Sequence, residues 1–200
     1  MKKFFAIAAL AVASLTANAQ AWLGGNIGYT STKTEIENKY ASLDNTASAF
    51  SFAPEVGYDL DENWSVALRL SYAHIDSYTV EINNDKFTGT ANSFAINPYV
   101  RYKFFNEGNF TAFIDGGITY GTTHLNGYSD VIENPNFFNI GFNPGIAYAI
   151  SDDVTLVAHF GDLSYNITTT KAKRYDVKST ISAFNIGLDN SISFGVYVAL

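Results

Sequence analysis

The 200-residue sequence contains no cysteine, which excludes a disulfide framework, cysteine-ligated metal sites and lipid attachment through an N-terminal cysteine. Basic residues are also scarce. Only 12 Lys and Arg stand against 19 Asp and Glu, giving a net charge of −7, so no nucleic-acid partner is expected. Charged residues make up 16% of the chain, below the roughly 25–35% of a typical soluble surface. Beyond the N-terminus, no apolar run approaches the ~20 residues of a membrane-spanning helix.

The N-terminus has the three parts of a secretory signal peptide. Lys2 and Lys3 provide the positive charge, residues 4–15 form the apolar segment, and an A-x-A cleavage site ends at Ala19. This pattern predicts a signal peptide over residues 1–19 that is cleaved after Ala19, with a cut after Ala21 as the alternative. We therefore expect an exported protein whose folded domain spans residues 20–200.

The body of the chain repeats one pattern of alternating apolar residues. Three segments have apolar residues at every second position, a proline at the fifth position and a tyrosine at the ninth: FSFAPEVGYDL at 50–60, FAINPYVRYKF at 94–104 and IGFNPGIAYAI at 140–150. Each is followed by a short polar turn and a second alternating run, at 64–72, 110–120 and 154–160. A period of two is typical of β-strands, and a short turn between two such runs predicts a hairpin.

Three hairpins, a leading strand at 22–30 and a closing strand at 192–200 predict eight antiparallel strands. Four polar stretches are expected to be long loops at the end opposite the short turns: 31–48, 75–92, 121–136 and about 167–179. Short turns at one end and long loops at the other are typical of outer-membrane barrels. A turn at Asp189-Asn190 would instead give nine strands, with the C-terminus at the loop end. We prefer a single long closing strand.

Two features favour a barrel with its apolar face outside over a soluble, lipocalin-like barrel. The polar face of the strands is mostly Ala, Ser, Gly, Thr and Asn, which suits the narrow interior of eight strands. Aromatic residues gather near the predicted turns, where a membrane protein places rings at headgroup level: Trp22, Trp64, Tyr58, Tyr102 and Tyr148. Pro54, Pro98 and Pro144 are expected to face lipid at positions where a bulge or a dispensable donor accommodates them.

Residues 17–20, the three proline-centred segments and the alternating C-terminal end together resemble a known family. This is the small eight-stranded outer-membrane β-barrel family, OmpA/OmpX-like and porin-family proteins common in Bacteroidetes. The resemblance implies an all-β, up-and-down transmembrane barrel in the cell outer membrane, in contact with outer-membrane lipid and lipopolysaccharide. Residues 192–200 look like the signal recognised by the barrel-assembly machinery, with Leu200 in place of the usual Phe.

The turn lengths predict which charged residues face each other inside the barrel. With Asp61-Glu62-Asn63 as a three-residue turn, Glu55 lies opposite Arg69, and the same counting places Arg101 opposite Asp115. Lys103 extends this interior set, with Asn97, Tyr99, Asn139, Asn143 and His159. Because a buried charge needs a partner, we interpret these residues as a structural plug. A narrow small-solute pore lined by the same residues is the alternative.

The sequence provides no catalytic constellation, metal-ligand spacing or cofactor motif, since its histidines, His74, His124 and His159, are dispersed. A lipid A-modifying enzyme is the further alternative. The loops are the expected working surface. The fourth carries a basic cluster suited to lipopolysaccharide phosphates or another anionic ligand: Lys171, Lys173, Arg174 and Lys178. We therefore expect a structural or surface-binding protein, with an extracellular protein or glycan as its ligand.

Overall fold

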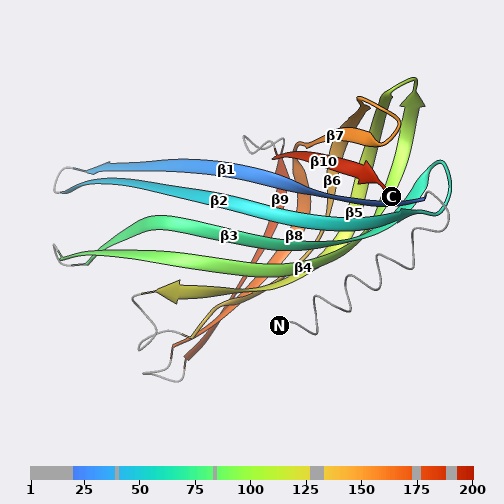
Figure 1. The fold of residues 1–200 in the computed structure, drawn as a ribbon. Helices are drawn as coiled ribbons and strands as arrows, with labels where there is room; N and C mark the ends of the chain where they lie inside the picture. The colour runs from blue at the N-terminus through green and yellow to red at the C-terminus, as the bar shows by residue number, and fades with distance from the viewer. Residues whose placement is uncertain (1–19, 39–40, 83–84, 127–132, 173–176, 188–192) are drawn as a thin grey trace.

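The computed structural model describes residues 20–38, 41–82, 85–126, 133–172, 177–187 and 193–200, nearly all of them in β-strands (Figure 1). The strands are β1 (Ala21–Asn38), β2 (Ala41–Asp59), β3 (Trp64–Ile82), β4 (Asp85–Glu107), β5 (Phe110–Asn126), β6 (Asn136–Ala149), β7 (Val154–His159), β8 (Asp162–Ala172), β9 (Val177–Gly187) and β10 (Ser193–Ala199). None of the described residues belongs to a helix with the length and hydropathy of a transmembrane span.

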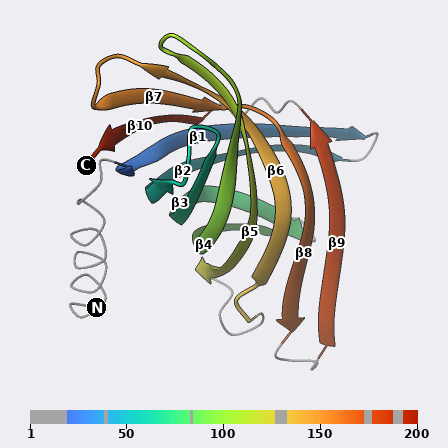
Figure 2. The same ribbon diagram turned by 90° about the vertical axis from the view of Figure 1, so that its right-hand side faces the viewer.

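The strands close into a ring of eight. β1 to β6 pair in chain order, β6 pairs with β7 along one part of its length and with β8 along another, and β7 pairs with β10, which pairs with β1. β7 and β8 are therefore two parts of one barrel strand, and β9 and β10 are two parts of the last. Figure 2 shows β8 beside β9 and, at the other end of these two barrel strands, β7 near β10. The predicted eight-stranded antiparallel barrel is confirmed.

The break between β7 and β8 is a β-bulge. Gly145 of β6 lies opposite His159, whereas Phe142 lies opposite Leu163, so three steps along β6 correspond to four along its partner. Gly161 lies at the break with a φ of 81°, a left-handed conformation that glycine adopts without the penalty of a Cβ atom.

The last barrel strand does not reverse direction. β9 is antiparallel to β8 and β10 is antiparallel to β7, so β9 and β10 run the same way. The backbone N–H of Leu200 donates to the carbonyl oxygen of Ala21 at 2.9 Å, and Figure 1 shows the C-terminus beside the start of β1. The nine-stranded alternative, with the C-terminus at the loop end, is therefore wrong. Asp189 and Asn190 themselves lie outside the described residues.

Most of the polar sequence predicted as long loops is strand. β1 and β2 stay paired as far as Asn38 and Ala41, and β3 and β4 as far as Ile82 and Asp85. Loops over 31–48 and 75–92 are therefore wrong, and much of 167–179 belongs to β8 and β9. Backbone pairing needs no apolar side chains, whereas the period-two signal is lost once both faces of a strand meet water. We call this end of the barrel the hairpin end and the opposite end, with the short connections, the turn end.

The outer face of the barrel is apolar and the inner face is polar or small. On β4, Phe94, Ile96 and Val100 are between 41% and 50% exposed, whereas the alternate residues Asn97 and Arg101 are buried. This distribution is the inverse of a soluble core and is the one expected of strands surrounded by lipid.

The aromatic residues of the turn end lie on both faces. Tyr58, Trp64, Tyr102 and Tyr148 occupy outward-facing positions, as predicted. Trp22 does not, because it is only 8% exposed and its ring stacks inside the barrel on that of Tyr197, with centroids 4.3 Å apart. Leu23 and Ile27 of β1 are exposed, so the alternation itself places Trp22 on the inner face, and its assignment to the outer aromatic girdle is wrong.

The three prolines occupy matching positions on outward-facing sites. Pro54, Pro98 and Pro144 each pair on one side, with Gly25, Leu68 and Ile114 respectively, and the ladder is interrupted on the other side. The interruption at Pro144 coincides with the β7–β8 bulge. At Pro54 and Pro98 the register continues unchanged, so of the two expected arrangements, a bulge or a dispensable donor, these two prolines have the second.

Candidate functional site

A charged network crosses the interior of the barrel and begins with a pair on β2 and β3. Glu55 lies directly opposite Arg69, as the turn length predicts. The Nε of Arg69 donates to Oε1 of Glu55 at 2.8 Å and its Nη2 donates to Oε2 at 3.3 Å. Glu55 is 1% exposed, so its charge is balanced by protein groups rather than by water.

A second pair joins β4 and β5 in the reverse order of charge. Arg101 lies opposite Asp115, again in the predicted register. Its Nε donates to Oδ1 at 2.7 Å and its Nη2 donates to Oδ2 at 2.9 Å, the bidentate geometry that makes arginine–carboxylate pairs strong. Both side chains are almost fully buried.

The two pairs are connected across the barrel. Nη2 of Arg69 lies 3.6 Å from Oδ2 of Asp115, and Nε2 of His159 lies 3.0 Å from the same oxygen. The hydroxyl of Tyr197 accepts from Nη2 of Arg101 at 3.1 Å and donates to Oε2 of Glu55 at 3.1 Å. Residues of β2, β3, β4, β5, β7 and β10 therefore belong to one network.

Glu55 has two further donors. The hydroxyl of Tyr99 donates to its Oε2 at 2.5 Å, and Nδ2 of Asn26 donates to its Oε1. The other amide atom of Asn26, Oδ1, is buried without a partner among the described residues. Two carboxylates and two guanidinium groups thus neutralise each other within a polar shell, which lowers the cost of burying them.

Aromatic rings surround Arg101 on the side facing the turn end. Its Cζ lies 3.8 Å from the ring centre of Phe113 and 5.2 Å from that of Tyr197, with Trp22 next in the same cluster. The interior set named from the sequence lacks Phe113, Tyr197, Trp22 and Asn26. Strand parity could have found each of them, because each lies in phase with the small or polar residues of its strand.

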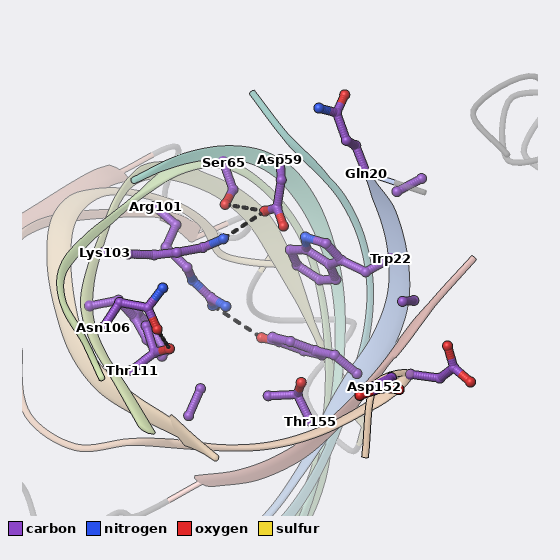
Figure 3. Close-up of a pocket in the computed structure, with 16 residues that line it drawn as sticks. Gln20, Trp22, Asp59, Ser65, Arg101, Lys103, Asn106, Thr111, Asp152 and Thr155 are labelled. Carbon is purple, nitrogen blue, oxygen red and sulfur yellow. Dashed lines mark hydrogen bonds and ion pairs between the residues drawn. The ribbon is translucent and has the colours of Figure 1, made fainter. Parts of the chain in front are cut away.

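Lys103 lies closer to the turn end than the network. Its Nζ is 3.0 Å from Oδ1 of Asp59, and Oγ of Ser65 donates to the same oxygen at 2.5 Å. Figure 3 shows this group at the wall of a cavity that is open at the turn end, with Arg101 and Trp22 beside it. Lys103 is therefore an interior residue, but its partner is Asp59 rather than a member of the central network.

The predicted basic cluster lies at the hairpin end. Lys171 of β8 is directly opposite Lys178 of β9, and both residues are exposed. Lys173 and Arg174 lie outside the described residues. His74 and His124 lie on either side of Asn92, on β3 and β5, whereas His159 lies inside the barrel on β7. Within the described part of the chain no group of three or more His, Asp or Glu is placed to hold a metal ion.

Comparison with known proteins agrees with this architecture. Neisserial surface protein A has a TM-score of 0.52 to this chain at 14% identity, over 92% of this chain and 98% of that one. OprG from Pseudomonas aeruginosa has a TM-score of 0.53 at 10% identity, over 90% of this chain and 97% of that one. At such identities the likeness concerns the fold alone. A search of curated protein sequences found no match.

The sequence itself matches a family model. The model of the outer membrane protein beta-barrel domain covers residues 4–190, nearly the whole chain. The structure agrees with this match, because the chain forms a closed antiparallel barrel with an apolar outer face. The chain is thus an outer-membrane β-barrel protein and belongs to the outer membrane protein beta-barrel domain family.

Proposed function

We propose that this protein is a non-enzymatic barrel with a structural or surface-binding role, whose interior is plugged by polar and charged side chains. The observation that carries the proposal is the network that joins Glu55, Arg69, Arg101 and Asp115 across the interior. Its members hold one another by short hydrogen bonds, and Tyr197 and His159 link them to the last strands. A solute would have to displace mutually bonded, buried charges, which is costly.

Conductance of the refolded barrel in a planar bilayer tests the plug. We expect no stable ohmic channel from the unmodified protein. Replacing one ion pair by small residues, as in Arg101→Ala/Asp115→Ala, removes one of the two arginine–carboxylate pairs and should produce small conductance steps. The exposed Glu62→Gln, at the β2–β3 turn, is the control and should remain silent. Stable channels from the unmodified protein would favour the narrow pore instead.

Surface binding is proposed for the basic cluster at the hairpin end. The register places Lys171 and Lys178 side by side and exposed, a doubled positive charge that suits the phosphates of lipopolysaccharide. Lys173 and Arg174 would add to it. The proposed role is to hold phosphate groups at the outer surface of the membrane.

Binding to lipopolysaccharide vesicles tests this role. Lys171→Gln/Lys178→Gln should weaken binding, and the residual binding should depend less on salt than that of the unmodified barrel. Lys33→Gln/Lys86→Gln, which changes the net charge equally on other hairpins, is the matched control and should bind nearly as well as the unmodified barrel. Equal loss in both variants would mean that net charge alone attracts the barrel, without a site.

A further inference from the structure

A cavity of about 320 Å³ lies below the network, at the turn end of the barrel. Its wall contains polar and charged side chains from several strands, including Asp59, Ser65, Arg101 and Lys103, with Trp22 among them (Figure 3). Family barrels direct their short turns to the periplasm, so the cavity faces that compartment. Its volume is at the lower end of the range for small-molecule sites.

Hydrogen-bond donors remain unengaged at the deep side of this cavity. Arg101 uses Nε and Nη2 for Asp115 and Tyr197, and Nη1 has no partner in the described residues. Nζ of Lys103 makes one ion pair, with Asp59, which leaves two of its three N–H groups. The indole nitrogen of Trp22 is turned toward Asp59 in Figure 3 and has no hydrogen-bond partner among the described residues.

An acceptor lies beside these donors. Oδ1 of Asp59 receives Ser65 and Lys103, whereas its Oδ2 has no partner in the part of the chain that the structure describes. The cavity therefore presents a positive and a negative group 3.0 Å apart, each with unused bonding capacity. The exposed Asp152 and Asp153 add negative charge at the mouth and disfavour entry of anions with several charges.

We propose that this cavity binds a small zwitterion whose amine and carboxylate are separated by one or two carbons. The ligand carboxylate accepts from Lys103 and Arg101, and its ammonium group donates to Asp59. An anion alone would face repulsion from Asp59, and a cation alone would face repulsion from Lys103 and Arg101. A ligand carrying both charges pairs with both groups. The network closes the side of the cavity toward the hairpin end, so the ligand enters from the turn end.

The two tryptophans of the chain provide a direct test. Trp22 lines the cavity, whereas Trp64 lies at the same end of the barrel but on the outer face, 44% exposed. Glycine is titrated into the ¹⁵N-labelled barrel, residues 20–200, refolded in micelles, and the two indole N–H resonances are followed. A saturable shift of the Trp22 resonance with an unchanged Trp64 resonance is the expected result. Absence of a saturable Trp22 shift overturns the proposal.

Ligands with a single charge distinguish a zwitterion site from an anion site or a cation site, and this test needs no substitution. Acetate and methylammonium, each at the concentration where glycine saturates, should shift the Trp22 resonance much less. If acetate is as effective as glycine, the cavity is an anion site and the proposal is wrong. If methylammonium is as effective, the cavity is a cation site and the proposal is equally wrong.

Two substitutions identify the groups that hold the ligand. Asp59→Asn and Lys103→Gln should each raise the dissociation constant for glycine roughly tenfold, the effect of losing one charged hydrogen bond. Glu62→Gln, an equal loss of charge in the neighbouring turn, should leave it unchanged, because Glu62 does not line the cavity. Equal affinity in Asp59→Asn, Lys103→Gln and the unmodified barrel would overturn the assignment.

Discussion

Glu55 and Arg69 face each other on adjacent strands with both guanidinium contacts formed, at 2.8 and 3.3 Å, inside a barrel whose outer face is apolar. Removing one partner leaves the other charge buried and incompletely paired. Glu55 would lose its two guanidinium bonds and retain the hydroxyls of Tyr99 and Tyr197 and the amide of Asn26. The pair therefore stabilises the barrel mainly by preventing an uncompensated charge.

We predict that Glu55→Gln and Arg69→Gln each lower the free energy of unfolding by about 3 kcal/mol, the range seen when one partner of a buried pair is removed. The double variant should cost less than the sum of the two, with a coupling energy of about 1–3 kcal/mol. Urea unfolding in lipid vesicles measures all three. Glu62→Gln combined with Arg69→Gln is the control and should be additive, because Glu62 is exposed in the turn. Additivity in the Glu55 cycle would mean that the two side chains do not interact.

Gly57 provides a second prediction. It lies on β2 facing inward, where an added methyl group would overlap the indole ring of Trp22. We expect Gly57→Ala to destabilise the barrel by about 1–3 kcal/mol, the cost of overpacking a close-packed interior. Adding Trp22→Leu should recover part of this loss, because the smaller side chain vacates the overlapping space. Urea unfolding again gives the comparison.

Gly116→Ala is the matched control for Gly57→Ala. Gly116 lies in the middle of β5 and its added methyl group would meet only the ring of Phe142, at 3.0–3.1 Å. Phe142 is 51% exposed on the outer face and has room to turn away. If Gly116→Ala lowers the free energy of unfolding as much as Gly57→Ala does, the cost comes from replacing any strand glycine and not from the overlap with Trp22.

The sequence predicts the features that depend on local alternation and turn length. Strand number, the inner and outer faces, and the pairs Glu55–Arg69 and Arg101–Asp115 all follow from period two and from turns of known length. The hairpin-end extensions do not, because a strand with water on both faces has no apolar alternation to reveal it. The result is that long loops are predicted where β1 to β4 continue as paired strand.

Local sequence patterns also do not predict how the interior network closes across the barrel. Tyr197 reaches Glu55 from the last strand, 142 residues away in the chain, and this contact exists only because the ring closes between β1 and β10. The position of Trp22 could have been predicted from parity, but a single aromatic residue at the start of a strand resembles a girdle residue by composition. Composition and parity disagree there, and parity is right.

Gly161 provides a third prediction, at the bulge between β7 and β8. Its φ of 81° lies in the left-handed region, which costs other residues about 1–2 kcal/mol. Gly161→Ala should lower the free energy of unfolding by about this amount, and Gly161→Asn should cost less because asparagine tolerates left-handed backbone. Gly108, with a φ of 57° in the β4–β5 turn and nothing near its missing Cβ, is the comparison site. A similar penalty for Ala and Asn at Gly161 would point to packing rather than backbone conformation.

His74 gives a prediction on pH. It lies on β3 between Tyr72 and the exposed Asp76, with Nδ1 2.7 Å from Oδ1 of Asn92 and Nε2 3.1 Å from Oδ1 of Asp76. The hydrogen bond to Asn92 and, next, that to Asp76 raise the pKa of His74 above its usual value of 6.5. Only the doubly protonated ring donates to both oxygens at once. NMR titration of the His74 ring should therefore show a pKa above that of a model histidine.

The consequence for stability follows from the sign of this shift. Because the folded state binds the proton more tightly than the unfolded state, His74 stabilises the barrel below the unfolded-state pKa, and this contribution is lost as pH rises through the folded-state pKa. Asn92→Ala should lower the pKa of His74 more than Asp76→Asn does, since the bond to Asn92 is the larger cause. His74→Gln should remove the pH dependence in this window. An unchanged pKa in Asn92→Ala would contradict the assigned hydrogen bond and leave Asp76 as the only source of the shift.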